Sequence, residues 1–170
     1  LMVKDWQVRK RRPVRRKQVA PLLSALEKNL GIDFNLEGAF LEMAEYGPWN
    51  LMIVNKEPHA VEVLDDDDNK VAALTLRGLL ANNSEKSWLE VDRGAIPFLM
   101  NGADCMAAGI HAADTAVESG DLVWIRDQEH KRPLALGWAC MDAEEMISAT
   151  TGKAVRTLHW VGDELWSMEF

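Results

Sequence analysis

The sequence is poor in the residues and motifs from which enzymatic sites are built. It has 2 cysteines and 1 tyrosine among 170 residues. A GxxxxGK[ST] phosphate loop, a GxGxxG turn, a GxSxG nucleophile elbow and an HExxH pair are all missing. These absences argue against an enzyme, so we expect no catalytic residues and no cofactor.

Long apolar runs are missing as well. No segment approaches the ~18 uncharged apolar residues of a membrane span. The basic N-terminal stretch lacks the apolar region and small-residue cleavage site that would complete a secretory signal. We therefore expect a soluble, cytoplasmic protein without a membrane partner.

The candidate metal ligands lie at unsuitable spacings. Cys105 and Cys140 are far apart and sit in apolar surroundings, which predicts two buried free thiols. The 4 histidines match no zinc pattern, so each is expected to be exposed or hydrogen-bonded. The acidic run at residues 65–68 lacks the alternating ligands of a calcium loop and predicts a solvated hairpin tip. We expect no metal site.

The overall composition is typical of a globular protein, but the charged residues are distributed unevenly along the chain. With 48% hydrophobic and 27% charged residues, the chain can build a core of its own. Residues 1–87 hold 13 basic and 13 acidic side chains, whereas residues 88–170 hold 6 and 14, so the net charge of −8 belongs to the second half. The first half contains a cluster that we call the basic pole: Arg9, Lys10, Arg11, Arg12, Arg15, Arg16 and Lys17.

The first half predicts helices followed by strands. Leucines and a valine recur at helical spacing over residues 19–30, and Gly31 follows where a C-terminal cap belongs. Residues 36–45 predict a second, weaker helix behind Asn35 as a possible N-cap. From Trp49 onward, short β-rich runs predict an antiparallel meander whose last two strands are joined through residues 65–70.

A polar segment at residues 82–87 separates the two charge regimes and predicts a boundary between domains 1–87 and 88–170. The second domain predicts short helices over residues 94–100 and 143–151, the latter with Asp142 and Glu145 as a capping box. Its β-rich runs are WLEV, CMAAGI, LVWIRD, PLALGWACM, KAVRTLHW and LWSMEF. The fold class is therefore α+β, with a small barrel as the second domain. Most of its 5 tryptophans should be core residues.

Two features indicate a binding function. The basic pole is interrupted by Pro13 and repels itself, so it should stay exposed and contact phosphates; a merely solvated charged segment is the alternative. Small residues cluster in VDRGAIPFLMNGADCMAAGI, where they permit either tight turns or the close approach of a ligand backbone.

The ordered Gly-Ala series in VDRGAIPFLMNGADCMAAGI, with SGDLVWIRD, PLALGWACM, GKAV and HWVGDELW, resembles a PUA domain, the RNA-binding module of pseudouridine synthases and archaeosine transglycosylases. The resemblance implies a C-terminal β pseudo-barrel whose first short helix and glycine-bearing edge hold an RNA backbone, frequently near the acceptor end of transfer RNA. The implied RNA-binding residues are Arg93, Gly94, Ala95, Gly102, Ala103, Asp104, Gly109, Lys153 and Arg156.

The whole chain is similar to a narrower family, the archaeal relatives of the malignant T-cell-amplified sequence protein, through the same segment and through MDAEEM and HWVGDELWSMEF. This similarity implies a non-catalytic translation factor that binds transfer RNA or ribosomal RNA on the small ribosomal subunit, in initiation, reinitiation or recycling. It also implies a partner like the density-regulated protein. Two alternatives stay open: an accessory subunit that delivers RNA to a tRNA or rRNA modification enzyme, and a protein-interaction module whose acidic face docks a basic ribosomal protein.

Overall fold

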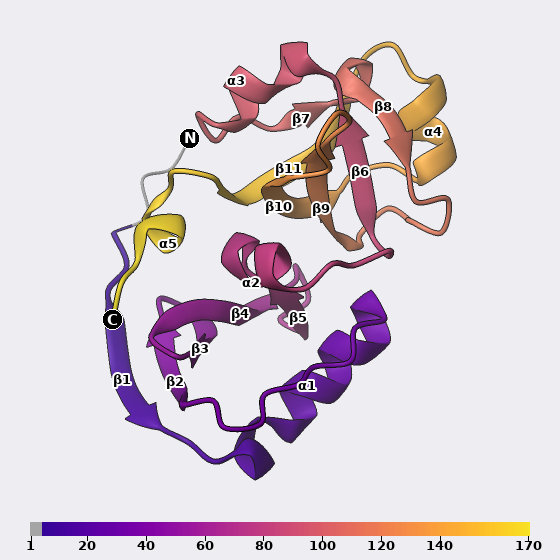
Figure 1. Cartoon of the computed structure of the whole chain (residues 1–170). Coiled ribbons are helices and arrows are strands. Elements are labelled where there is room, and N and C mark those ends of the chain that lie inside the picture. The colour runs from indigo at the N-terminus through magenta and orange to yellow at the C-terminus, as the bar shows by residue number, and fades with distance from the viewer. Residues whose placement is uncertain (1–4) are drawn as a thin grey trace.

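The N-terminal half is an antiparallel sheet packed against one long helix. The computed structural model describes residues 5–170, and its first sheet has the strand order β1-β2-β3-β4-β5 (Figure 1). The elements of this half are β1 (Val8–Pro13), α1 (Arg16–Leu30), β2 (Leu41–Tyr46), β3 (Trp49–Val54), β4 (Glu57–Leu64), β5 (Lys70–Leu74) and α2 (Leu76–Ala81).

The expected helix α1 is confirmed, and its apolar stripe accounts for its packing. Val19, Leu22, Leu23, Leu26 and Leu30 are the buried residues of α1. The helix ends at Gly31, whose left-handed φ of 68° suits a residue without a side chain, and whose N–H donates to the Glu27 carbonyl. The helix therefore covers the sheet with one face and leaves its charged face in solvent.

The C-terminal half is a six-stranded sheet with the order β7-β11-β10-β9-β6-β8. All its neighbouring strands are antiparallel except β6 and β9, which run parallel. Its elements are β6 (Trp88–Val91), the short 3-10 turn η1 (Arg93–Ala95), α3 (Ile96–Leu99), β7 (Cys105–Met106), η2 (Ala107–Gly109), β8 (Ile110–Ala113), β9 (Leu122–Asp127), β10 (Pro133–Ala139), α4 (Ala143–Ser148), β11 (Lys153–Trp160) and α5 (Glu164–Ser167). The α+β class with two successive β-rich halves is confirmed.

Each half has its own apolar core, but the first core reaches into the second half. It includes Trp124, Trp138 and Leu165 together with the leucines of α1 and the strands β2 to β5. Helix α2 lies between the two halves, packed against β4 on one side and β10 on the other (Figure 1). The segment 82–87 connects α2 to β6, and the domain division that we predict there remains a proposal.

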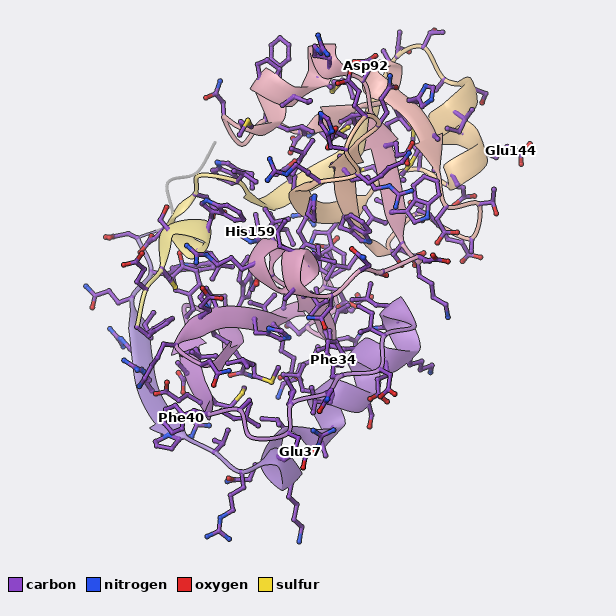
Figure 2. The ribbon with its side chains drawn as sticks, in the orientation of Figure 1. Phe34, Glu37, Phe40, Asp92, Glu144 and His159 are labelled. Atoms are coloured by element: carbon purple, nitrogen blue, oxygen red, sulfur yellow. The ribbon has the colours of Figure 1, made fainter. Side chains whose placement is uncertain are left out.

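A buried histidine and the C-terminal segment join the halves. His159 in β11 is 0% exposed, and its Nε2 accepts from the N–H of Leu76 in α2 at 3.2 Å (Figure 2). Arg77 in α2 donates through Nε to the Trp166 carbonyl at 2.7 Å. The chain thus returns from the second sheet to the first, and its end at Phe170 lies under the Arg11 guanidinium.

Three of the expected elements are wrong. The run CMAAGI is not one strand, because the 3-10 turn η2 separates the two-residue strand β7 from β8. Residues 36–45 do not form a helix: the Asn35 side chain accepts from the N–H of Glu37, which makes a turn, and β2 follows. Pairing with β1 and β3 satisfies both edges of β2, and this tertiary gain outweighs a weak helical preference. The run LWSMEF is not a strand, because Asp163 accepts from the N–H of Trp166 and begins α5.

Two smaller predictions, the ends of helix α4 and the burial of Cys140, also need correction. Helix α4 ends at Ser148 rather than at residue 151, and Asp142 caps no helical N–H but accepts from Ser119. Both cysteines are free, and Cys105 is buried, but Cys140 is exposed because it lies just beyond the end of β10. Trp124 and Trp138 are buried, whereas the other three tryptophans of the second half are partly buried.

Candidate nucleic-acid interface

The small residues of the second half surround one groove. A cavity of about 590 Å³ opens between the η1–α3 segment and the β7–η2 segment. Six of the nine RNA-binding residues implied by the sequence line it: Gly94, Ala95, Ala103, Asp104, Gly109 and Lys153. The fold therefore brings together residues that are up to 59 positions apart in the chain.

Local hydrogen bonds and the absence of a side chain at Gly109 set the shape of the groove. Asp92 accepts from the N–H of Ala95 at 3.3 Å and so begins η1, at the labelled position in Figure 2. The Asp92 N–H in turn donates to the Gly109 carbonyl. A Cβ at Gly109 would lie 3.1 Å from the Ala95 Cβ, which is tighter than nearly all real contacts. Small residues at both positions therefore allow the two walls to approach this closely.

Apolar side chains form the rim of the groove and stand in solvent. Phe98 is 67% exposed and Met106 is 49% exposed, and both line the cavity. Met100, which follows α3, is 44% exposed. The sequence pattern does not single out Phe98, because an IPFL run is equally typical of a core helix. An aromatic ring held in solvent beside a groove offers a surface on which a nucleobase can stack.

Lys153 is the cation within the groove, and Asp104 holds it. The Lys153 Nζ lies 2.8 Å from Asp104 Oδ2, while Asp104 Oδ1 accepts from the N–H of Thr157. Burial opposes ionisation of Asp104, but the hydrogen bonds from Lys153 and Thr157 outweigh it and lower the pKa of Asp104. The same ion pair raises the pKa of Lys153. A phosphate that binds here must share the lysine with a carboxylate.

The other three implied residues lie outside the lining of the groove. Arg93 is exposed and pairs with Glu129 at 2.8 Å. Arg156 lies 3.5 Å from Asp66 in the acidic turn of the N-terminal half. Gly102 adopts a φ of +81°, and a Cβ there would meet the Trp160 ring at 2.6 Å, so its glycine serves the turn after α3.

The basic pole is divided between β1 and the start of α1. Two of its seven members are paired, Lys10 with Glu45 at 3.1 Å and Arg11 with Glu42 at 2.7 Å. Five exposed members form no ion pair with the residues that the structure describes: Arg9, Arg12, Arg15, Arg16 and Lys17. Figure 1 shows β1 along the side of the first half and α3 at the top of the second, and no member of the basic pole lines the groove, so the two are separate surfaces.

Within residues 5–170, no group of three or more histidine, cysteine or acidic side chains could hold a metal ion. In the same part of the chain, no helix is both long and apolar enough to cross a membrane. His159 and Asp163 do face each other at 2.8 Å, but both side chains are almost fully buried and therefore serve packing.

Comparison with known proteins identifies the second half. Residues 87–161 match the family model of the PUA domain. An uncharacterized protein from Methanocaldococcus jannaschii is 41% identical over 129 residues, which cover 76% of this chain and 76% of that protein. The chain belongs to the PUA-domain proteins. A conserved PUA domain protein from Thermoplasma acidophilum has the same fold, with a TM-score of 0.77 at 26% identity over 92% of this chain and 97% of that one.

This PUA-domain protein is also related to proteins of translation. Translation machinery-associated protein 20 of Saccharomyces cerevisiae is 34% identical over 85 residues, 46% of this chain and 47% of that protein. A homolog of malignant T-cell-amplified sequence 1 from Drosophila melanogaster is 30% identical over 80 residues, 45% of this chain and 44% of that protein. Each match spans about half of the relative, so function beyond RNA binding by the PUA domain is a proposal.

Proposed function

We propose that this protein is a non-catalytic RNA-binding protein that contacts transfer RNA or the small ribosomal subunit in translation initiation or recycling. The groove beside α3 takes an unpaired stretch of RNA, and the basic pole contacts phosphates of the same RNA or of ribosomal RNA. The relationship to translation machinery-associated proteins supports the proposed role in translation.

The exposed ring of Phe98, which lines the same groove as Lys153, is the observation that carries the proposal. The groove combines a stacking surface, one cation and a wall of small residues that lets a backbone approach closely. Single-stranded RNA is bound through this combination of ring stacking and phosphate contact. A fully paired duplex offers fewer exposed base faces to Phe98, so an end or a loop is the expected substrate.

The charge of the surface makes the expected affinity modest. Arg93, Lys153 and Arg156 all have a carboxylate partner, so each phosphate contact must displace or share one. The five unpaired members of the basic pole have no such competitor among residues 5–170 and should supply most of the salt-dependent part of the affinity. The groove should therefore contribute to affinity through base stacking, and the basic pole should determine how strongly the affinity depends on salt.

Binding of labelled transfer RNA, with and without its single-stranded 3′ end, tests the groove. Phe98→Ala should weaken binding of the intact RNA about tenfold, since one base stack contributes ~1–3 kcal/mol, and should matter little once the end is removed. Ile147→Ala is the matched control, because Ile147 is another exposed apolar residue, on α4. Equal affinities of the Phe98 and Ile147 variants for intact RNA contradict the assignment of the groove.

A salt series tests the basic pole. Substitutions are preferable to truncation, because removing residues 1–17 would strip β1 from the sheet. Replacing Arg9, Arg15, Arg16 and Lys17 by glutamine should reduce the slope of log affinity against log salt by up to about 3, at ~0.7 for each phosphate that the variant no longer neutralises. An unchanged slope would show that these charges are merely solvated at the surface of β1 and α1 and contact no phosphate.

A further inference from the structure

The lining of the groove beside α3 carries more negative than positive charge. Its charged residues are Asp92, Asp104 and Lys153, so two carboxylates stand against one ammonium group. Arg156 also interacts electrostatically with Asp104 from outside the lining, but its guanidinium lies 3.5 Å from the Asp66 carboxylate. Such a lining repels a group that carries two negative charges of its own, such as a terminal phosphate.

The Asp104 carboxylate is fixed in position and keeps unused hydrogen-bonding capacity. Its Oδ1 accepts from the N–H of Thr157 at 2.9 Å, and its Oδ2 lies 2.8 Å from the Lys153 Nζ. A carboxylate has about four lone-pair sites, so about two remain for a ligand. The side chain of Asp104 is 32% exposed and lines the cavity, so a molecule in the groove can reach these sites.

A carboxylate with two free acceptor sites matches two adjacent hydroxyl groups. In an unmodified RNA strand, such a pair occurs at the 3′ end, where the last ribose carries both its 2′- and its 3′-hydroxyl. An internal ribose has the 2′-hydroxyl alone and is flanked by a phosphate on each side. Dinucleotide-binding proteins also use a carboxylate to bind ribose hydroxyls.

The other walls of the groove fit one terminal nucleoside. The cavity measures about 590 Å³, within the roughly 300–1,000 Å³ of small-molecule sites. Phe98 on the rim is free to stack on the terminal base. The Lys153 side chain is 48% exposed, more than its carboxylate partner, and can therefore contact the singly charged phosphodiester that precedes the terminal nucleoside.

We propose that the groove beside α3 binds the last nucleoside of an RNA with a free 3′ end, and that Asp104 accepts hydrogen bonds from its 2′- and 3′-hydroxyls. Asp104 is thereby a specificity-determining residue, which favours a 3′-terminal diol and repels a 3′-phosphate. This inference rests on the proposed function, because it specifies which part of an RNA the groove takes.

Four forms of one transfer RNA test the chemistry of the end. They share their bases and end in a 2′,3′-diol, a 3′-phosphate, a 2′-deoxyribose or a 3′-deoxyribose. The full chain should bind the 3′-phosphate form at least about tenfold more weakly than the diol. Each deoxy form should bind severalfold more weakly than the diol, because one hydrogen bond to a charged group is lost. Equal affinities for the diol and the 3′-phosphate overturn the inference.

A variant of the chain tests the role of Asp104. Asp104→Asn removes the charge but keeps an oxygen for the Thr157 N–H, and it should reduce the preference for the diol over the 3′-phosphate to less than about threefold. Asp67→Asn is the matched control, because it changes the net charge equally at an exposed residue outside the groove and should keep the full preference. A full preference in Asp104→Asn contradicts the role of Asp104. A melting curve checks that this variant folds, and the comparison of the four RNAs on the unaltered chain does not depend on it.

Failure of this inference and failure of the proposed function give different results. If Phe98→Ala weakens all four forms alike and the diol and 3′-phosphate forms bind equally, the groove binds RNA without reading its end, and only this inference is wrong. If neither Phe98→Ala nor removal of the single-stranded end changes the affinity, the groove is not the RNA site, and the groove assignment of the proposed function is wrong as well.

Discussion

Removal of the His159 side chain should destabilise the protein by several kcal/mol. The imidazole is 0% exposed, and because its Nε2 accepts from the Leu76 N–H, its proton lies on Nδ1 and is donated to Asp163 Oδ2 at 2.8 Å. The ring therefore satisfies one group in each half of the molecule. Its location at the junction of the halves is visible in Figure 2.

The size of the effect follows from the two hydrogen bonds that are removed and the space left behind. His159→Ala leaves the buried Leu76 N–H without an acceptor, which costs about 1–3 kcal/mol. Asp163 loses one donor but keeps the N–H groups of Trp160 and Trp166, so this part costs about 1 kcal/mol. With the packing of the missing ring, we expect a total of about 3–5 kcal/mol.

Urea unfolding followed by tryptophan fluorescence measures this loss. His159→Asn should lie between the wild type and His159→Ala, because its amide N–H can still reach Asp163 while the Leu76 N–H stays unpaired. His130→Ala is the control, since this exposed histidine should contribute within about 0.5 kcal/mol. If His159→Ala costs less than about 1 kcal/mol, the inter-half hydrogen bond does not stabilise the fold.

Three further stability predictions concern other positions. Glu90→Gln should cost about 3 kcal/mol in urea unfolding, because it leaves Arg126, packed 4.0 Å from the Trp88 ring, without its buried carboxylate. Gly102→Ala should lower the melting temperature by several degrees, because alanine is strained at a φ of +81° and its Cβ would clash with the Trp160 ring. Gly120→Ala has open space around its Cβ and should show only the effect of the backbone strain. Burial opposes ionisation of Asp163, yet hydrogen bonds with His159 and backbone N–H groups keep the pKa of Asp163 lowered. Ionised Asp163 therefore contributes to the free energy of unfolding above about pH 4, and this contribution is lost as the pH falls through the pKa of the folded state. In Asp163→Asn, the free energy of unfolding should fall less steeply with decreasing pH.

Local sequence patterns were sufficient for most of the elements. The leucine stripe of α1 and the β-rich runs of the sheets have periodicities that fix which face is buried, whichever partner covers it. They failed at 36–45, at 105–110 and at 165–170, where short segments have no strong period. There, sheet pairing of β2 and the cap from Asp163 decided the structure.

The candidate site was partly visible in the sequence for a similar reason. Glycine and alanine in the 94–109 segment mark close backbone approaches, and the fold does place Gly94 and Gly109 on opposite walls of one groove. The exposure of Phe98 left no mark in the sequence, because an aromatic residue in a short apolar helix looks like a core residue. The sequence also does not show which carboxylate pairs with which cation, since partners such as Asp66 and Arg156 are 90 residues apart.

Local spacing and composition were enough to predict the α+β class, the order of most elements, the charge asymmetry and the small residues around the groove. The pairing of the cations, the exposure of Phe98 and the position of His159 between the halves follow from the three-dimensional packing instead. Each of these depends on how segments far apart in the chain meet or fail to meet, and such long-range packing leaves no periodic signal in the residues that take part in it.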